Sequence, residues 1–96
     1  MGKNYIVEYH PDVLNEDVCR LDHSKKKIIA TAIEDKLCEA PEVFGKPLRN
    51  DLRNYRSFRV ADYRIIFRLA GRVIKILKIG HRSNVYSEIK KRMGLM

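Results

Sequence analysis

The fold of this 96-residue chain is decided by its second half, which reads RSFRVADYRIIFRLAGRVIKILKIG from Arg56 to Gly80. This stretch contains three runs rich in β-branched and aromatic residues: 56–61, 63–70 and 73–80. Asp62 separates the first two runs, and the short reversal 70–72, Ala-Gly-Arg, separates the last two. Dense runs of this kind joined by tight reversals are typical of antiparallel strands. We therefore predict a three-stranded antiparallel meander.

The two faces of this meander differ in chemistry, because successive side chains of a strand point to opposite sides. One face receives the apolar side chains Phe58, Val60, Tyr63, Ile65, Phe67 and Leu69. The other face receives Ser57, Arg59, Arg64, Ile66 and Arg68. The first face must be covered by other elements, and the second is expected to be largely cationic.

The first half of the chain supplies the elements that cover the apolar face of the meander. Residues 4–9 predict a strand that ends at His10-Pro11, and the apolar spacing after Pro11 predicts a short helix to about Arg20. Apolar residues at helical spacing predict a second helix over about 25–39, with Asp22 and Ser24 as possible N-cap residues. Prolines and a glycine in 40–47 predict a loop, and residues 85–93 predict a short basic helix with Ile89 facing inward.

The predicted architecture is therefore a single α+β domain spanning residues 1–96. We expect an antiparallel sheet of about four strands, in the order β-α-α-β-β-β with a short C-terminal helix, packed on a two-helix hairpin.

The net charge of +8 is distributed unevenly along the chain. Residues 1–44 contain 6 Lys or Arg and 9 Asp or Glu, a balance of −3, whereas residues 45–96 contain 14 and 3, a balance of +11. This segregation favours a polyanionic partner such as a nucleic acid or an acidic protein segment. A solvated basic surface kept for solubility is the alternative.

Several classes of protein are disfavoured by the composition. Apolar stretches are far shorter than the roughly 20 residues of a membrane span, and no signal-peptide pattern is present, so a soluble cytoplasmic protein is expected. Cys19 and Cys38 are interpreted as small buried apolar residues. The three histidines are widely separated, and neither metal-ligand spacing nor a Gly-rich phosphate loop occurs, so we expect no metal or other cofactor.

Four arginines are candidate binding residues on the cationic face: Arg59, Arg64, Arg68 and, after the last strand, Arg82. Guanidinium groups bind phosphate oxygens through a planar fork of donors and stay charged at any relevant pH. An exposed arginine without a role is the alternative for each one. Their convergence on one face favours phosphate binding.

The ordered combination of three segments resembles the RelE/ParE superfamily of bacterial and archaeal toxins, and its RelE branch in particular. These segments are Gly45–Arg49, Tyr55–Phe67 and Ile79–Tyr86. The resemblance spans nearly the whole chain. It implies the toxin of a type II toxin–antitoxin pair that inhibits translation by metal-independent cleavage of mRNA in the ribosomal A site.

The resemblance also implies roles for individual residues. The family's catalytic positions fall on Arg64, Arg82 and Tyr86. RNA-binding positions are assigned to Arg59, with Arg56, Arg68 and His81 as further candidates. In the family's reaction the ribose 2′-hydroxyl attacks the adjacent phosphate, so that Arg64 and Arg82 would stabilise the charge that develops at phosphorus.

The sequence departs from the family at its lysine positions and at Phe67, a position that is more often tyrosine in relatives. Well-studied RelE enzymes carry two lysines on the strand before Arg59, and counting back from Arg64 places Tyr55 and Ser57 at those positions. Neither residue supplies a cation, so the lysine pair is absent. A toxin of the ParE type, which binds DNA gyrase without cleaving RNA, therefore remains the alternative. Both readings imply an antitoxin partner, and the first also implies contact with ribosome and mRNA.

Overall fold

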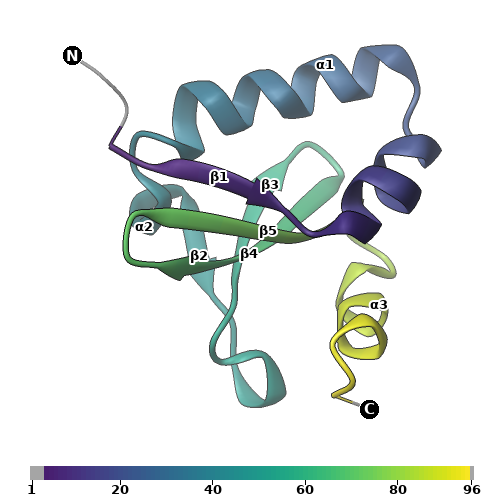
Figure 1. Ribbon diagram of the computed structural model, residues 1–96. Helices are drawn as coiled ribbons and strands as arrows, with labels where there is room; N and C mark the ends of the chain where they lie inside the picture. Colours follow the sequence, from purple (N-terminus) through teal and green to yellow (C-terminus); the bar gives the residue numbers. More distant parts are fainter. Residues whose placement is uncertain (1–3, 96) are drawn as a thin grey trace.

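The computed structural model describes residues 4–95 and contains a five-stranded mixed sheet in the order β1-β5-β4-β3-β2 (Figure 1). The strands are β1 (Ile6–Tyr9), β2 (Gly45–Pro47), β3 (Arg56–Val60), β4 (Tyr63–Ala70) and β5 (Val73–His81). The helix α1 (His23–Ala32) crosses one face, and α3 (Val85–Arg92) lies at the end of β5 on the other side (Figure 1). The α+β class and the order of the main elements are confirmed. The expectation of a wholly antiparallel sheet is wrong, because β1 pairs parallel with β5.

The meander β3-β4-β5 forms as predicted, with tight reversals between its strands. Val60 pairs with Tyr63 across the first reversal, where Ala61 adopts a positive φ of 52°. Ala70 pairs with Val73 across the second, where Gly71 has a φ of 61°. The register of β4 and β5 shifts at Ile66/Phe67.

The helical hairpin also forms, although its turns are irregular. Two helical turns, η1 (Val13–Asp17) and η2 (Val18–Arg20), follow β1, and α1 continues into a further turn, η3 (Ile33–Leu37). The Asp22 side chain caps α1 by accepting a hydrogen bond of 2.9 Å from the Lys25 N–H.

Two elements differ from the sequence-based expectation of about four strands and a loop over 40–47. That segment forms a helical turn, α2 (Pro41–Phe44), followed directly by β2, which pairs antiparallel with β3. Proline at the start of α2 fits a helix N-terminus, where no N–H is required. A further short turn, η4 (Asn50–Leu52), precedes β3. The added strand β2 places new side chains beside β3.

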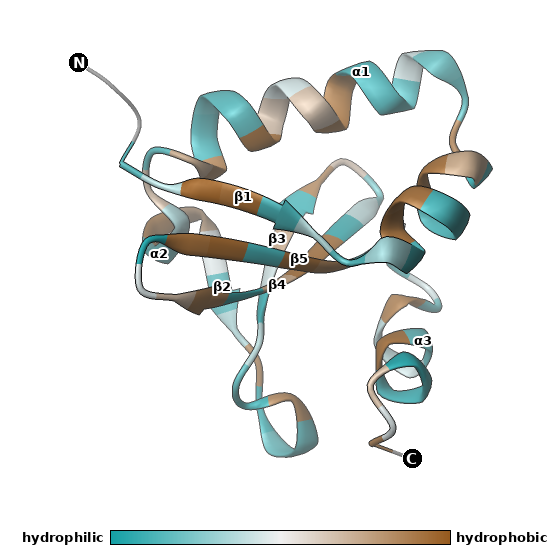
Figure 2. Ribbon diagram, in the orientation of Figure 1, coloured by the Kyte–Doolittle hydropathy of each residue, from teal (hydrophilic) through white to brown (hydrophobic). Residues whose placement is uncertain are grey.

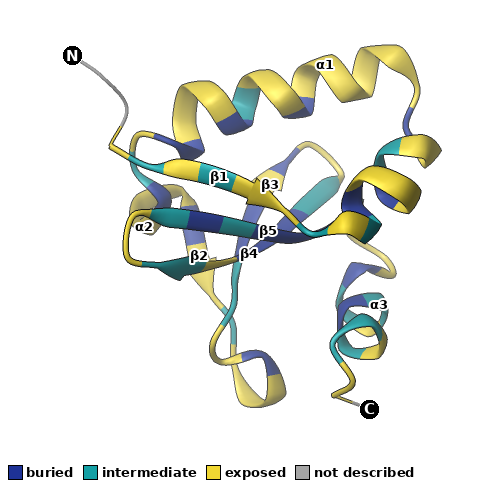
Figure 3. Ribbon diagram, in the orientation of Figure 1, coloured by how far each residue is buried: buried dark blue, intermediate teal, exposed yellow. Residues whose placement is uncertain are grey.

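The main core lies between the helical hairpin and the predicted apolar face of the sheet. Ile29, Ile33 and Leu37 of α1 and η3 face the sheet and are buried, while most of the outward-facing residues are hydrophilic and exposed (Figures 2 and 3). This core contains Val13, Leu21, Ile29, Ile33, Leu37, Cys38, Phe58, Val60, Ile65, Phe67, Ile74, Ile76 and Ile79. Cys38 is buried as expected, whereas the expectation for Cys19 is wrong, because Cys19 is exposed.

A second, smaller core corrects the expectation that the opposite face is an open cationic surface. Here α3 packs against the centre of the sheet, and its Ile89 faces inward as predicted. The buried members are Leu52, Ile66, Leu77, Val85 and Ile89. The cationic side chains therefore occupy the part of this face that α3 leaves uncovered. Within residues 4–95, no helix is long and apolar enough to cross a membrane.

Candidate functional site

A hollow of about 360 Å³ lies on the uncovered part of the second face, between the β2 edge and α3. Its lining comes from four separate segments of the chain and consists of Phe44, Lys46, Pro47, Leu48, Ser57, Arg59, Arg64 and Tyr86. We call this hollow the basic groove. Its volume falls within the range of ligand sites, about 300–1,000 Å³. Three cations and one phenol thus share a single concave surface.

Strand pairing explains how the basic groove is built. Arg59 pairs with Arg64 across β3 and β4, and Lys46 pairs with Ser57 across β2 and β3. Residues opposite one another in an antiparallel pair present their side chains on the same face. Two such pairs therefore line the groove side by side.

Tyr86 enters the basic groove from α3. Its hydroxyl forms a hydrogen bond of 3.1 Å with the Ser57 hydroxyl. The ring packs against the second core, so that the hydroxyl end faces the groove while the ring is partly buried. The sequence placed Tyr86 near the site but gave no sign of this bond to Ser57.

Arg64 and Arg82 both form hydrogen bonds with the reversal between β3 and β4. Arg64 Nη1 donates to the carbonyl oxygens of Ala61, at 3.0 Å, and Tyr63, at 2.9 Å. The Arg82 N–H donates to the Asp62 carbonyl oxygen at 2.8 Å, and its Nε lies 3.8 Å from Asp62 Oδ1. Arg64 lines the basic groove, whereas Arg82 is an exposed residue beside the reversal.

The other three predicted RNA-binding residues do not line the basic groove. Arg56 lies two residues before Phe58 on β3, so its side chain is on the helix side of the sheet. It donates a hydrogen bond of 2.9 Å to the Gly45 carbonyl oxygen. Arg68 shares the face of Arg64 but pairs with Lys75, farther along β4. His81 pairs with Tyr63 across β5 and β4. The His81 ring lies edge-on to the Tyr63 ring on the helix side of the sheet, with the ring centroids 5.8 Å apart. Strand alternation separates Arg56 and His81 from the site.

The cationic side chains of the basic groove differ from Lys78 and Arg92, which are buried and form ion pairs with Asp17. Within residues 4–95, neither Lys46 nor Arg59 forms an ion pair, and Arg64 bonds to carbonyl oxygens. Uncompensated cations in a concave surface raise the local positive potential. The groove is therefore suited to an anion.

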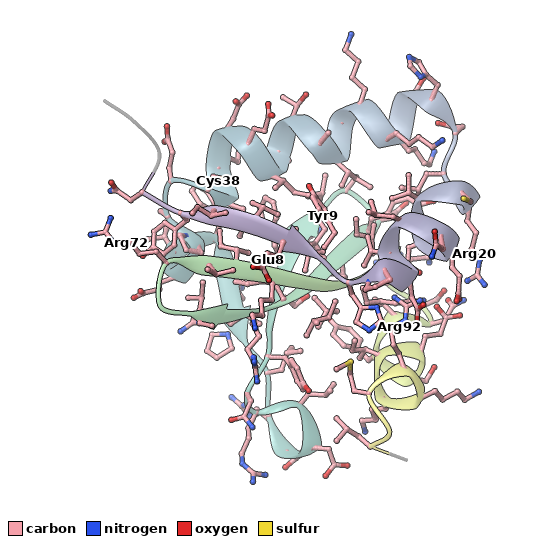
Figure 4. All side chains as sticks on the ribbon, viewed as in Figure 1. Glu8, Tyr9, Arg20, Cys38, Arg72 and Arg92 are labelled. Atoms are coloured by element: carbon pink, nitrogen blue, oxygen red, sulfur yellow. The ribbon has the colours of Figure 1, made fainter. Side chains whose placement is uncertain are left out.

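A buried ion cluster fixes α3, the helix that carries Tyr86. Asp17 in η1 accepts hydrogen bonds from Arg92 in α3 and Lys78 in β5. The Asp17 side chain is fully buried, and Figure 4 shows Arg92 where the helical turns after β1 meet α3. Burial alone would raise the pKa of Asp17, but hydrogen bonds from Arg92, the Ile79 N–H and Lys78 outweigh it and lower that pKa.

Residues 7–86, from β1 to Tyr86, match the family model described as the ParE toxin of type II toxin–antitoxin system, parDE. The chain is also 32% identical to Toxin RelE of Mycobacterium tuberculosis (strain ATCC 25618 / H37Rv) over 83 residues, which cover 81% of this chain and 86% of that protein. The chain belongs to the RelE/ParE superfamily. It is a toxin of a type II toxin–antitoxin system.

Solved structures of toxin–antitoxin complexes contain the same fold. The RelBE2 complex from M. tuberculosis includes a chain with a TM-score of 0.77 and 26% identity, covering 82% of this toxin and 99% of that chain. A chain of the E. coli DinJ–YafQ complex has a TM-score of 0.53 and 20% identity, covering 86% and 98%. The YoeB–YefM complex from Staphylococcus aureus gives a TM-score of 0.57 at 18% identity, covering 80% and 95%.

Lys46 is the groove residue that sequence reasoning missed. Gly45 and Pro47 on either side of Lys46 are typical of a loop, and the pairing of β2 with β3 is a tertiary contact. No group of three or more His, Cys, Asp or Glu side chains among residues 4–95 is placed to hold a metal ion.

Proposed function

We propose that this RelE/ParE-family toxin is an endoribonuclease that cleaves mRNA in the ribosomal A site without a metal ion, and so inhibits translation. The observation that carries the proposal is the basic groove, which brings Lys46, Arg59 and Arg64 beside the Tyr86 hydroxyl. Single-stranded RNA offers phosphates and unstacked bases, and cations and aromatic rings bind these groups.

The reaction proposed for this groove needs no group beyond RNA and protein. The ribose 2′-hydroxyl attacks the adjacent phosphorus, the bond from phosphorus to the 5′-oxygen breaks, and the 2′-hydroxyl proton is lost while the leaving oxygen gains one. The products are a 2′,3′-cyclic phosphate and a 5′-hydroxyl. Arg64 would stabilise the negative charge on the phosphorane from within the groove. Arg82 would act from the β3–β4 reversal once its side chain turns from Asp62 toward the RNA.

Primer extension on a defined mRNA in a purified translation system, with and without ribosomes, tests the proposal. We expect cuts in the A-site codon that depend on the ribosome and decrease at least 100-fold in Arg64→Ala and Arg82→Ala. Arg72→Ala is the matched control, because Arg72 lies in the exposed β4–β5 reversal and points away from α3 (Figure 4). Intact mRNA at concentrations of toxin that stop growth would refute the nuclease.

Inhibition of DNA gyrase is the second candidate function. The matching family model describes a ParE toxin, and Tyr55 and Ser57 replace the lysine pair of well-studied RelE enzymes. A supercoiling assay with purified gyrase separates the two functions. Inhibition of supercoiling together with intact mRNA would favour the ParE activity.

We further propose that an antitoxin binds the toxin across the hairpin and the β1 edge. Apolar side chains are exposed there, including Ile6 at 66%, Leu14 at 54% and Ile28 at 56%. A shallow apolar hollow of about 300 Å³ lies beside them, lined by Tyr9, Leu14 and residues of α1. Exposed apolar patches of this kind favour a protein partner. Co-purification with the product of the neighbouring reading frame tests it, and the variant Leu14→Asp should weaken that complex.

A further inference from the structure

The basic groove has one wall to which the sequence analysis assigns no binding residue, formed by the segment 44–48 from the end of α2 through β2. This segment contributes Phe44, Lys46, Pro47 and Leu48 to the lining. Lys46 is its one charged side chain in the groove, and it is exposed. The segment is anchored on both sides, because β2 pairs with β3 and the Phe44 ring packs edge-on against Phe58 at 6.2 Å.

The position of Lys46 relative to Ser57 determines which groups the Lys46 ammonium lies beside. The two residues pair across β2 and β3, so that their side chains stand next to each other on the groove face. Ser57 is neutral, and its hydroxyl is bonded to the Tyr86 hydroxyl. Lys46 therefore places a positive charge on the side of the Ser57–Tyr86 pair that faces the β2 edge, while Arg59 and Arg64 lie across the groove on β3 and β4.

From this arrangement we infer that Lys46 contacts an RNA phosphate in the basic groove and supplies the cation on the side of Ser57. An ammonium on a flexible stem suits a phosphate as a point charge, and no acidic side chain within residues 4–95 neutralises this one. A phosphate between Lys46 on one side and Arg59 and Arg64 on the other is contacted from both walls. The inference rests on the proposed function for the identity of the anion, because it takes RNA as the ligand.

The first measurement is binding of the isolated toxin to a short single-stranded RNA whose 2′-hydroxyls are methylated, so that it cannot be cleaved. Fluorescence anisotropy gives the Kd over a series of KCl concentrations for the unaltered toxin and for Lys46→Ala. We expect Kd to rise about 5- to 10-fold in Lys46→Ala. The slope of the logarithm of the association constant against the logarithm of the salt concentration should become less steep by about 0.7, the value for one phosphate contact on a single strand.

Two variants control for the general loss of charge and for the location of the cation. Lys75→Ala removes the same charge from the same side of the sheet, at a position that pairs with Arg68 outside the groove, and should change Kd less than 2-fold. The double variant Lys46→Ala/Ser57→Lys returns a lysine to the adjacent strand and should recover most of the lost affinity. Circular dichroism of each variant confirms that the fold is retained.

The second measurement is the rate of mRNA cleavage on the ribosome for the same set of variants, which separates the inference from the proposed function. If the unaltered toxin cleaves and Lys46→Ala equals Lys75→Ala in both assays, the inference about Lys46 is overturned and the nuclease stands. If no protein cleaves but Lys46→Ala selectively loses RNA binding, the nuclease fails and the phosphate contact stands. Absence of measurable RNA binding by the unaltered toxin at low salt overturns the inference as well.

Discussion

Arg92 binds Asp17 through two parallel hydrogen bonds, of 2.8 Å to Oδ2 and 2.9 Å to Oδ1, across 75 residues of sequence. Lys78 Nζ adds a bond of 3.1 Å to the same carboxylate, and the Ile79 N–H adds one of 2.9 Å. Every oxygen of this buried group is thus satisfied, which is the condition under which a buried charge is tolerated. The cluster joins η1, β5 and α3, and it therefore determines where Tyr86 lies.

Replacing Asp17 by asparagine should destabilise the toxin strongly. The change removes the one fully buried carboxylate that Arg92 and Lys78 share and leaves them only the partly exposed carboxylates of Asp12, Glu16 and Glu88. Breaking a buried pair in this way costs about 3–5 kcal/mol. Urea denaturation monitored by circular dichroism measures the free energy of unfolding. Glu16→Gln is the control, because Glu16 is half exposed and lies 3.6 Å from Arg92, so its loss should cost less than about 1 kcal/mol. Equal stabilities of the two variants would contradict the prediction.

The same carboxylate predicts how stability depends on pH. The pKa of Asp17 is lowered in the folded state, whereas an unfolded aspartate has a pKa near 3.9. As the pH falls, the unfolded chain therefore takes up a proton before the folded chain does, and the stabilisation is lost. The difference in unfolding free energy between the toxin and Asp17→Asn should be constant above about pH 5 and shrink below about pH 4. Urea titrations from pH 3 to pH 7 measure it, and a difference that grows on acidification would be inconsistent with this assignment.

The bond between Ser57 and Tyr86 predicts energetic coupling between β3 and α3. Tyr86→Phe and Ser57→Ala each remove one hydroxyl of the pair, and the double variant removes both. We expect a coupling free energy of about 0.5–1.5 kcal/mol in a double-mutant cycle of unfolding free energies. Strictly additive effects would show that the hydroxyls do not interact in solution.

Gly45→Ala should displace the β2 wall of the basic groove. A Cβ on Gly45 would overlap the Phe67 ring and lie 2.8 Å from the Pro41 carbonyl oxygen, so the core or β2 must move. Overpacking of this kind costs about 1–3 kcal/mol. We also expect weaker RNA binding, because Lys46 moves with β2.

Gly71→Ala provides a comparison for that variant. Gly71 has open space around its Cα but a φ of +61°, so alanine there is strained by about 1–2 kcal/mol without touching β2. Urea denaturation and RNA anisotropy on both variants test the pair of expectations. Normal RNA binding by Gly45→Ala would show that β2 keeps its place.

The amino-acid sequence predicts the meander, the helical hairpin and the face on which Arg59 and Arg64 lie. These features follow from local patterns: alternation with a period of two, apolar spacing near 3.6, and reversals at Asp62 and Gly71. The position of Tyr86 near the site followed from the resemblance to RelE/ParE toxins. The tight reversal between β3 and β4 then sets their register, and the structure shows that Arg59 pairs with Arg64.

Tertiary structure alone decided which side chains meet. The strand β2 forms because Gly45–Pro47 finds a partner in β3, and a three-residue segment holding a glycine and a proline carries no strand pattern of its own. The Asp17 cluster likewise joins residues up to 75 positions apart. Helical spacing places Asp17 on the face of Val13 and Leu21, but no local pattern identifies Lys78 and Arg92 as its partners. Local patterns set the direction of each side chain, whereas partners across strands and helices depend on how the elements pack.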